Sequence, residues 1–179
     1  YYSLIWVQEG KGNAKVETTQ FDFNANTLFS FVPYQPFMLK AEKEFKGVVI
    51  NFHPDFFCIH KHHKEVACHG VLFNNVYNPP CISLDETAAN TFSTLIDQMK
   101  TEMKHPALAQ YELLVSYLKI FLINASRLKK VQQPETIATT AEQKEPFILQ
   151  NLKDAIEKDF KTKHSASDYA EALNISAKA

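Results

Sequence analysis

The chain has 179 residues, of which 45% are hydrophobic and 12% aromatic, which is enough for one sizeable core and excludes an intrinsically disordered protein. Its formal net charge of -1 excludes the broad cationic field of sequence-independent DNA binders, so this chain by itself is expected to bind DNA poorly. No run approaches the ~20 apolar residues of a membrane span and no signal peptide opens the chain, so we expect no membrane partner.

Short β-like runs fill the chain up to residue 84. The first, residues 2–7, leads through a Gly-rich segment to residues 14–18, a pattern typical of a hairpin. Further runs separated by Asn- and Pro-containing turns cover residues 21–23, 27–32, 37–41 and 48–53. Strands at roughly ten-residue spacing predict a small antiparallel barrel or sandwich over 1–84. Because Tyr1 opens directly on the first run, we expect the chain to begin inside this domain.

The segment 54–78 mixes a Pro-initiated helical turn with an apolar run at 71–73, and predicts a short helix followed by a loop. From residue 85 the hydrophobic period changes from two to nearly four. The box Ser83-x-x-Glu86 indicates a helix start. The apolar stripe of this helix contains Ala89, Phe92, Ile96, Met99 and Met103.

A break at His105-Pro106 separates this helix from a second one at about 107–130, with Pro106 at its first position. The stripe of the second helix contains Leu108, Tyr111, Val115, Leu118, Leu122, Ala125 and Leu128. Residues 85–131 therefore predict an antiparallel helix pair. Its second stripe is wide enough to serve both the barrel and a partner subunit, so we expect a homodimer with candidate contacts Tyr111, Val115, Leu118 and Leu122.

Residues 132–145 are polar and Thr-rich, which is typical of an interdomain linker. Pro146 then opens a helix that ends in a short break at Lys163-His164. The expected buried side chains of this helix are Phe147, Leu149, Leu152, Ile156 and Phe160.

Two helix starts lie eleven residues apart near the C-terminus, at Ser165 and Ser176. Ser165-x-x-Asp168 is a capping signature for a short helix at 169–173, on which the small Ala170 lets a second helix pack closely. Residues 174–176 form the turn, and Ser176 caps the second helix. This is the pattern of a helix-turn-helix, whose second helix enters the major groove of DNA.

The string S-x-x-D-Y-A-x-x-L-N-I-S at 165–176 resembles the start of the DNA-binding domain of AraC/XylS-type transcription regulators. The resemblance implies an α+β chain: a mainly β, cupin-like effector-binding barrel (1–84), a dimerisation helix pair (85–131), a linker (132–145) and the start of a helical DNA-binding domain (146–179). It implies DNA and a small-molecule effector as partners, with Ser176 and Lys178 at the DNA-reading helix. The alternative is that the string is an ordinary helical corner.

A cupin barrel is also compatible with a metal-dependent enzyme, which would carry a recognisable metal motif. Such enzymes carry a strand-borne H-x-H with a Glu, and a later P-x-G-x-x-H turn. The best match to that turn is 33–37, where Tyr34 replaces the Gly and Phe37 falls near the position of the histidine ligand. The histidine itself is absent from this match. We therefore expect no catalytic metal, no enzyme activity and no cofactor. A metal-dependent enzyme, or a ligand-binding module without a DNA role, remains the alternative.

Aromatic side chains are expected to line the barrel, from the alternating sets Tyr2, Leu4, Trp6 and Phe29, Phe31. Such a lining suits a small organic effector. The candidate ligand-binding residues are Tyr2, Trp6, Phe31, Phe37, Asn51 and His53. The alternative is that they close-pack the core of a small barrel.

Thiol and imidazole groups are dense between residues 58 and 69. The candidate zinc ligands are Cys58, His60, His62 and Cys68, near His63, Glu65 and His69. Their spacing matches no zinc-finger pattern, and the favoured interpretation is a surface segment with solvated histidines and two half-buried thiols, with zinc as the alternative. The odd, sparse count of three cysteines argues against a disulfide framework and favours a reducing compartment, so we expect a cytoplasmic protein.

Overall fold

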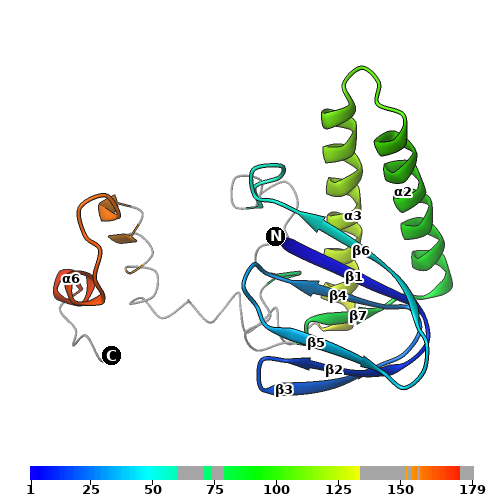
Figure 1. The fold of residues 1–179 in the computed structure, drawn as a ribbon, viewed down its shortest axis with the longest axis horizontal. Coiled ribbons are helices and arrows are strands. Elements are labelled where there is room, and N and C mark those ends of the chain that lie inside the picture. The colour runs from blue at the N-terminus through cyan, green and yellow to red at the C-terminus, as the bar shows by residue number, and fades with distance from the viewer. Residues whose placement is uncertain (60–70, 74–78, 134–151, 153–154, 157, 174–179) are drawn as a thin grey trace. The chain divides into compact units, whose positions relative to one another are not determined.

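The computed structural model describes residues 1–59, 71–73, 79–133, 152, 155–156 and 158–173 (Figure 1). The chain divides into two compact units, Tyr1–Pro134 (unit 1) and Glu135–Ala179 (unit 2). Its fold is mixed α+β, with two antiparallel sheets in unit 1. Within the described ranges, no helix combines the length and apolar character needed to cross a membrane.

The described residues of unit 1 form seven strands, which lie in two separate sheets (Figure 1). The first sheet has the order β6 (Lys46–Phe52), β1 (Tyr2–Glu9), β4 (Thr27–Phe31) and β7 (Cys81–Ser83). The second has the order β3 (Thr19–Phe23), β2 (Gly12–Val16) and β5 (Phe37–Ala41). Six of these strands lie where the sequence predicts them, and β7 was not predicted because three residues show no periodicity.

The expected closed barrel is not formed by the described strands, which pack instead as two open sheets with β5 and β6 at their edges. The expected hairpin between β1 and β2 is wrong, because these strands belong to different sheets. Gly10, with φ of 101°, turns the chain from one sheet to the other. A Cβ on Gly12 would lie 2.2 Å from the carbonyl oxygen of Lys40, so the corner leaves no room for a side chain there.

Strand β1 is buried on both faces. Leu4 and Trp6 contact the core between the first sheet and the helices, whereas Ile5 and Val7 contact the core between the two sheets. Unit 1 is therefore three layers deep: second sheet, first sheet and helix pair (Figure 1). We call the side of the first sheet that faces the second sheet its inner face.

Helix α2 (Glu86–Lys104) begins after Asp85, whose carboxylate accepts a 2.7 Å hydrogen bond from the amide of Ala88. The predicted cap at Ser83 is wrong, because Ser83 is the last residue of β7. Phe92 and Ile96 of the predicted stripe are buried, whereas Met103 is exposed near the helix end.

Helix α3 (Gln110–Gln132) starts later than predicted, after Ala109 in a left-handed conformation. Pro106 is therefore outside the helix, and Leu108 is fully exposed rather than part of the stripe. The stripe also missed Phe121, which is completely buried with its ring centroid 4.3 Å from that of Phe92. This ring contact holds α2 and α3 together.

Unit 2 contains helix α6 (Ala166–Ala172), which begins before the first residue of the predicted helix 169–173. Residues 155–156 and 158–159 are helical, and the chain leaves the helix before Lys163-His164, as predicted. Ile156 and Phe160 are exposed, so their prediction as buried residues is wrong. Among the described residues of unit 2, only Ala170 is buried, so these residues form no apolar core around Ile156 and Phe160. Phe147 and Leu149 lie outside the described residues, and Leu152 is half-buried.

Candidate functional site

One row across the inner face of the first sheet joins polar and aromatic groups. Asn51 of β6 pairs with Ser3 of β1, which pairs on its other side with Phe31 of β4. The Ser3 hydroxyl donates a 2.8 Å hydrogen bond to Oδ1 of Asn51. The side-chain amide group of Asn51 is exposed, so its NH₂ remains available as a donor.

The aromatic end of this row includes a side chain from the second sheet. Phe37 of β5 stacks on Phe31 with a centroid distance of 4.0 Å and parallel ring planes. Phe31 is buried, whereas Phe37 remains 40% exposed. Val49, one row along β6, is also exposed although its register partner Ile5 is buried. Apolar side chains at the edge strands β5 and β6 are therefore partly open to solvent.

In the described strands, neither the inner face of the first sheet nor the facing side of the second sheet carries a fixed charge. The register of β1 shifts at a bulge between Val7 and Glu9, so β1 is taken up to Val7. On the seven described strands, no Asp, Glu, Lys or Arg occupies a position that faces the other sheet. An ionised ligand buried there would lack a compensating charge, which costs several kcal/mol. The chemistry of these strands therefore suits a neutral molecule with an apolar ring and a group that hydrogen-bonds to Asn51 or Ser3.

The structure separates the six predicted ligand-binding residues. Phe31, Phe37 and Asn51 lie on the inner side, but Tyr2 and Trp6 point to the helix pair, because residues of opposite parity on β1 face opposite sides. The expectation that both aromatic sets line one interior is therefore wrong. The alternation along β1 groups Ser3 with Ile5, but it does not say which neighbour each group faces.

Tyr2 and Trp6 are core residues. The Tyr2 ring contacts those of Phe52 and Phe73 at 5.3 and 5.0 Å, and burial raises the pKa of its hydroxyl. The indole Nε1 of Trp6 is buried and has no hydrogen-bond partner among the described atoms.

His53 follows β6 and is exposed. Its Nδ1 accepts a 3.2 Å hydrogen bond from the amide of Asp55, and its ring meets the Tyr1 ring edge-on. These contacts place His53 at the surface, one residue beyond the end of β6.

Of the predicted zinc ligands, Cys58 is described as half-buried, and His60, His62 and Cys68 lie outside the described residues. Among the residues whose placement is given, no three His, Cys, Asp or Glu side chains gather as a metal site requires.

The predicted dimer contacts on α3 divide into two groups. Leu118 and Leu122 are buried in the core of unit 1, which puts them out of reach of a partner subunit. Val115 is half-buried against the same core. Tyr111 is exposed, but its hydroxyl donates a 2.7 Å hydrogen bond to the carbonyl oxygen of Phe56, so it anchors the chain after β6.

A different stripe of α3 is exposed. Leu113 and Ile120 are 37% and 45% exposed, and the half-buried Tyr117 lies between them. Their spacing of four and three residues places them on one line along the helix.

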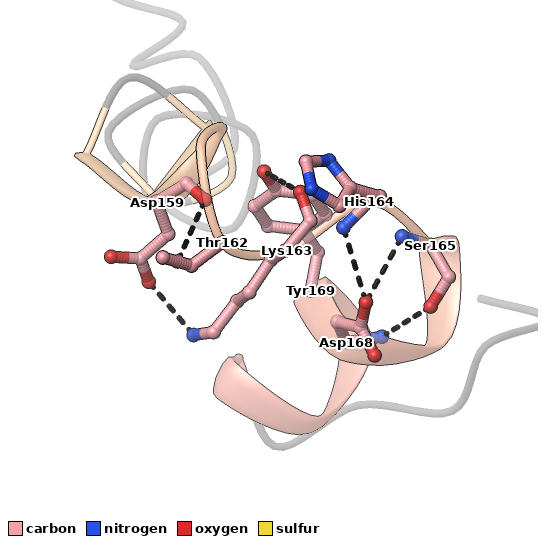
Figure 2. Close-up of polar contacts among 7 residues, drawn as sticks. All are labelled: Asp159, Thr162, Lys163, His164, Ser165, Asp168 and Tyr169. Carbon is pink, nitrogen blue, oxygen red and sulfur yellow. Dashed lines mark hydrogen bonds and ion pairs between the residues drawn. The ribbon is translucent and has the colours of Figure 1, made fainter.

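Unit 2 contains a tightly hydrogen-bonded corner before α6, drawn in Figure 2. The Ser165 hydroxyl accepts from the amide of Asp168 at 3.2 Å, and the Asp168 carboxylate accepts from the amides of Ser165 and His164 at 3.0 and 3.2 Å. This reciprocal capping box confirms the predicted pair. Hydrogen bonds from Ser165 and His164 lower the pKa of the Asp168 carboxyl, which keeps the box formed at neutral pH.

The same corner is tied to the preceding segment. Tyr169 donates a 3.0 Å hydrogen bond to the carbonyl oxygen of Lys163, whose ammonium lies 2.7 Å from Oδ2 of Asp159 (Figure 2). The hydrogen bond between the Lys163 ammonium and the Asp159 carboxylate raises the pKa of Lys163 and lowers the pKa of Asp159. These contacts set the direction in which α6 leaves the corner. Ser176 and Lys178, the predicted DNA contacts, lie outside the described residues.

No protein-family model matches this sequence, and no curated protein matches it either. Among solved structures, the chain is similar to the AraC-like transcriptional activator CuxR, with 9% sequence identity and a TM-score of 0.49. It is similar to ToxT from Vibrio cholerae O395 bound to (E)-4-(8-methylnaphthalen-1-yl)but-3-enoic acid, with 13% identity and a TM-score of 0.49. These matches cover 99% and 98% of this chain but 58% and 63% of CuxR and ToxT, so the chain spans less than two thirds of their length.

Proposed function

We propose that this chain is the sensing part of an AraC-type transcription regulator, together with the entrance to its helix-turn-helix. The observation that carries the proposal is the capping box of Ser165 and Asp168 at the start of α6, with the small Ala170 buried on that helix. A helix-turn-helix needs such a fixed first helix with a small inward residue, so that the second helix packs closely and projects into DNA. Ser176 and Lys178 are proposed to begin that second helix.

The effector is proposed to bind along the inner-face row, between the β5 and β6 edges. A flat ring would contact Phe37 and Phe31, and a neutral polar group would hydrogen-bond to Asn51. The row offers a hydroxyl, a carboxamide and two phenyl rings, which bind a ligand but provide no acid–base pair. This composition supports a sensor over an enzyme. Binding changes DNA affinity only if the effector favours one arrangement of the protein over another.

The regulator is proposed to act as a homodimer through the exposed stripe of α3. Leu113, Tyr117 and Ile120 follow the spacing by which two helices pack side by side. Leu113 and Ile120 are apolar although they face solvent, and Tyr117 between them is half-buried. A second copy of α3 would cover this stripe and would place two DNA-reading units on one operator, as dimeric helix-turn-helix proteins require.

The proposal is tested by selecting binding sites from a pool of random duplex DNA with the natural protein that carries this chain. We expect the wild type to enrich one defined sequence. Ser165→Ala removes the cap of α6 at a cost of about 1 kcal/mol, so enrichment should fall by at most roughly fivefold. Ser167→Ala is the matched control, because Ser167 is exposed in the same first turn and is not the capping residue.

Two outcomes would contradict this proposal. The first is that the wild-type protein enriches no sequence at low salt, where phosphate contacts are strongest. The second is that Ser165→Ala and Ser167→Ala change enrichment equally, which would remove the capped corner from DNA recognition.

A further inference from the structure

The last turn of α3 is joined to the free edge of β7 by a glutamine side chain. The amide of Ser83 donates to Oε1 of Gln132 at 3.0 Å, and Nε2 of Gln132 donates back to the carbonyl oxygen of Ser83 at 2.6 Å. A carboxamide has the donor and acceptor of a peptide group, so Gln132 takes the place of a neighbouring strand. It satisfies backbone groups that an edge strand otherwise leaves unpaired.

Two further contacts join the same turn to the sheet. Nε2 of Gln133 donates to the carbonyl oxygen of Cys81 at 3.2 Å. The carbonyl oxygen of Leu72 accepts from the Lys129 ammonium of α3 at 3.3 Å and from the Ser30 hydroxyl of β4 at 2.6 Å. The end of α3 is therefore held by polar side-chain contacts, whereas its middle is held by buried apolar residues.

These contacts stand at the point where the chain leaves unit 1. Gln133 is the C-cap of α3, and unit 2 begins at Glu135. Gln132 is exposed, so water competes for both of its hydrogen bonds. Such solvent-accessible bonds open at low free energy, independently of the buried core.

Strand β7 also connects this turn to the inner face. Cys81 pairs with Phe29 of β4, and the Phe29 ring stacks on Phe31 at 5.9 Å. Phe31 in turn belongs to the row that includes Asn51. The backbone hydrogen bonds between β4 and β7 therefore offer a physical route from the inner face to this turn.

We propose that the hydrogen bonds of Gln132 and Gln133 to β7 form a releasable contact, which we call the clasp. The state of the clasp determines whether the segment leading to unit 2 starts at the end of α3 or one turn earlier. In the closed state the last turn is helical and fixed to the sheet. In the open state the turn frays back towards Lys129, and the freed residues lengthen the connection between the units. The existence of the clasp is independent of DNA binding, whereas its regulatory meaning rests on the proposed function.

The clasp is tested by hydrogen–deuterium exchange on the full chain without ligand or DNA. We expect Gln132→Ala to accelerate exchange of the Ser83 amide and of the last turn of α3 by tenfold or more, which corresponds to about 1.4 kcal/mol. Tryptic cleavage after the exposed Lys130 should accelerate in parallel. Gln98→Ala, at an exposed glutamine of α2, is the matched control.

Gln132→Glu is a second variant that preserves side-chain size and the acceptor for the Ser83 amide but loses the donor. Local acceleration between those of the wild type and Gln132→Ala would support the clasp. Unchanged exchange at Ser83 in both variants would overturn it, and so would acceleration spread evenly over unit 1. Because no DNA is present, failure here leaves the DNA proposal standing, and failure of DNA selection leaves the clasp standing.

Discussion

Lys129 is a charged group buried in an apolar layer, with only 2% of its surface exposed. Burial lowers the pKa of its ammonium from 10.5 to about 8. Between these pH values the unfolded chain binds more protons than the folded one, so the free energy of unfolding must rise with pH. The stability that burial of the ammonium costs at neutral pH is thus regained above about pH 8.

Lys129→Met should therefore remove a pH dependence that the parent shows. From about pH 8 to about pH 10, the parent should gain roughly 2–3 kcal/mol relative to the variant. Denaturant unfolding followed by the fluorescence of Trp6, the single tryptophan, measures this difference in unit 1. Both proteins should carry Cys81→Ala, because burial raises the pKa of that thiol and its titration has the opposite sign. Lys15→Met, on the exposed side of β2, is the control. The prediction would be refuted if the free energy of unfolding depended on pH in the same way in Lys129→Met and in the parent.

At the scale of elements, α3 distributes its apolar residues over two sides. One side, with Leu118, Phe121 and Leu122, packs on the first sheet and α2. The other, with Leu113 and Ile120, remains exposed, and this exposed stripe is where we place the second copy of the chain.

A charge on the exposed stripe should weaken the dimer without unfolding unit 1. Ile120→Glu would bury an unpaired carboxylate between the helices, so the dimer dissociation constant should rise tenfold or more. Sedimentation velocity over a range of concentrations measures it. Met38→Glu is the control, because Met38 is an exposed apolar residue of β5 that lies on no helix. A monomeric parent, or equal effects of the two substitutions, would exclude this interface.

At the scale of the molecule, the proposed effector site exists only because strands from distant parts of the chain meet. Asn51, Ser3 and Phe31 come from three strands of one sheet, and Phe37 comes from the other sheet. The site is uncharged, so it should discriminate between ligands by charge as well as by shape.

We expect 2-naphthamide to raise the melting temperature of unit 1 and 2-naphthoate, of the same shape but charged, to raise it less. Asn51→Ala removes one hydrogen bond, so the affinity for 2-naphthamide should fall by about 1 kcal/mol. Asn13→Ala is the matched control, because Asn13 pairs with Asp22 on the outer side of the second sheet. Calorimetric titration measures both affinities. A preference for 2-naphthoate, or equal losses in both variants, would contradict the assigned row.

The sequence by itself determined the local elements, because turn chemistry, alternation and capping are properties of neighbouring residues. It located six strands and two long helices, and it identified the cap of Ser165 and Asp168 correctly. It also placed Phe31, Phe37 and Asn51 among the ligand candidates. Resemblance in one short string supplied the functional hypothesis.

Only the tertiary structure decided which side of each element faces which neighbour. On β1 both faces are buried, so alternation cannot tell Tyr2 and Trp6 from Ser3 and Ile5 until the helices and the second sheet are in place. The Gly10 corner resembles a hairpin locally, and only long-range pairing sends β2 to a different sheet. The contacts of Gln132 with Ser83, 49 residues away, have no local signal at all, because they depend on where α3 ends against the sheet.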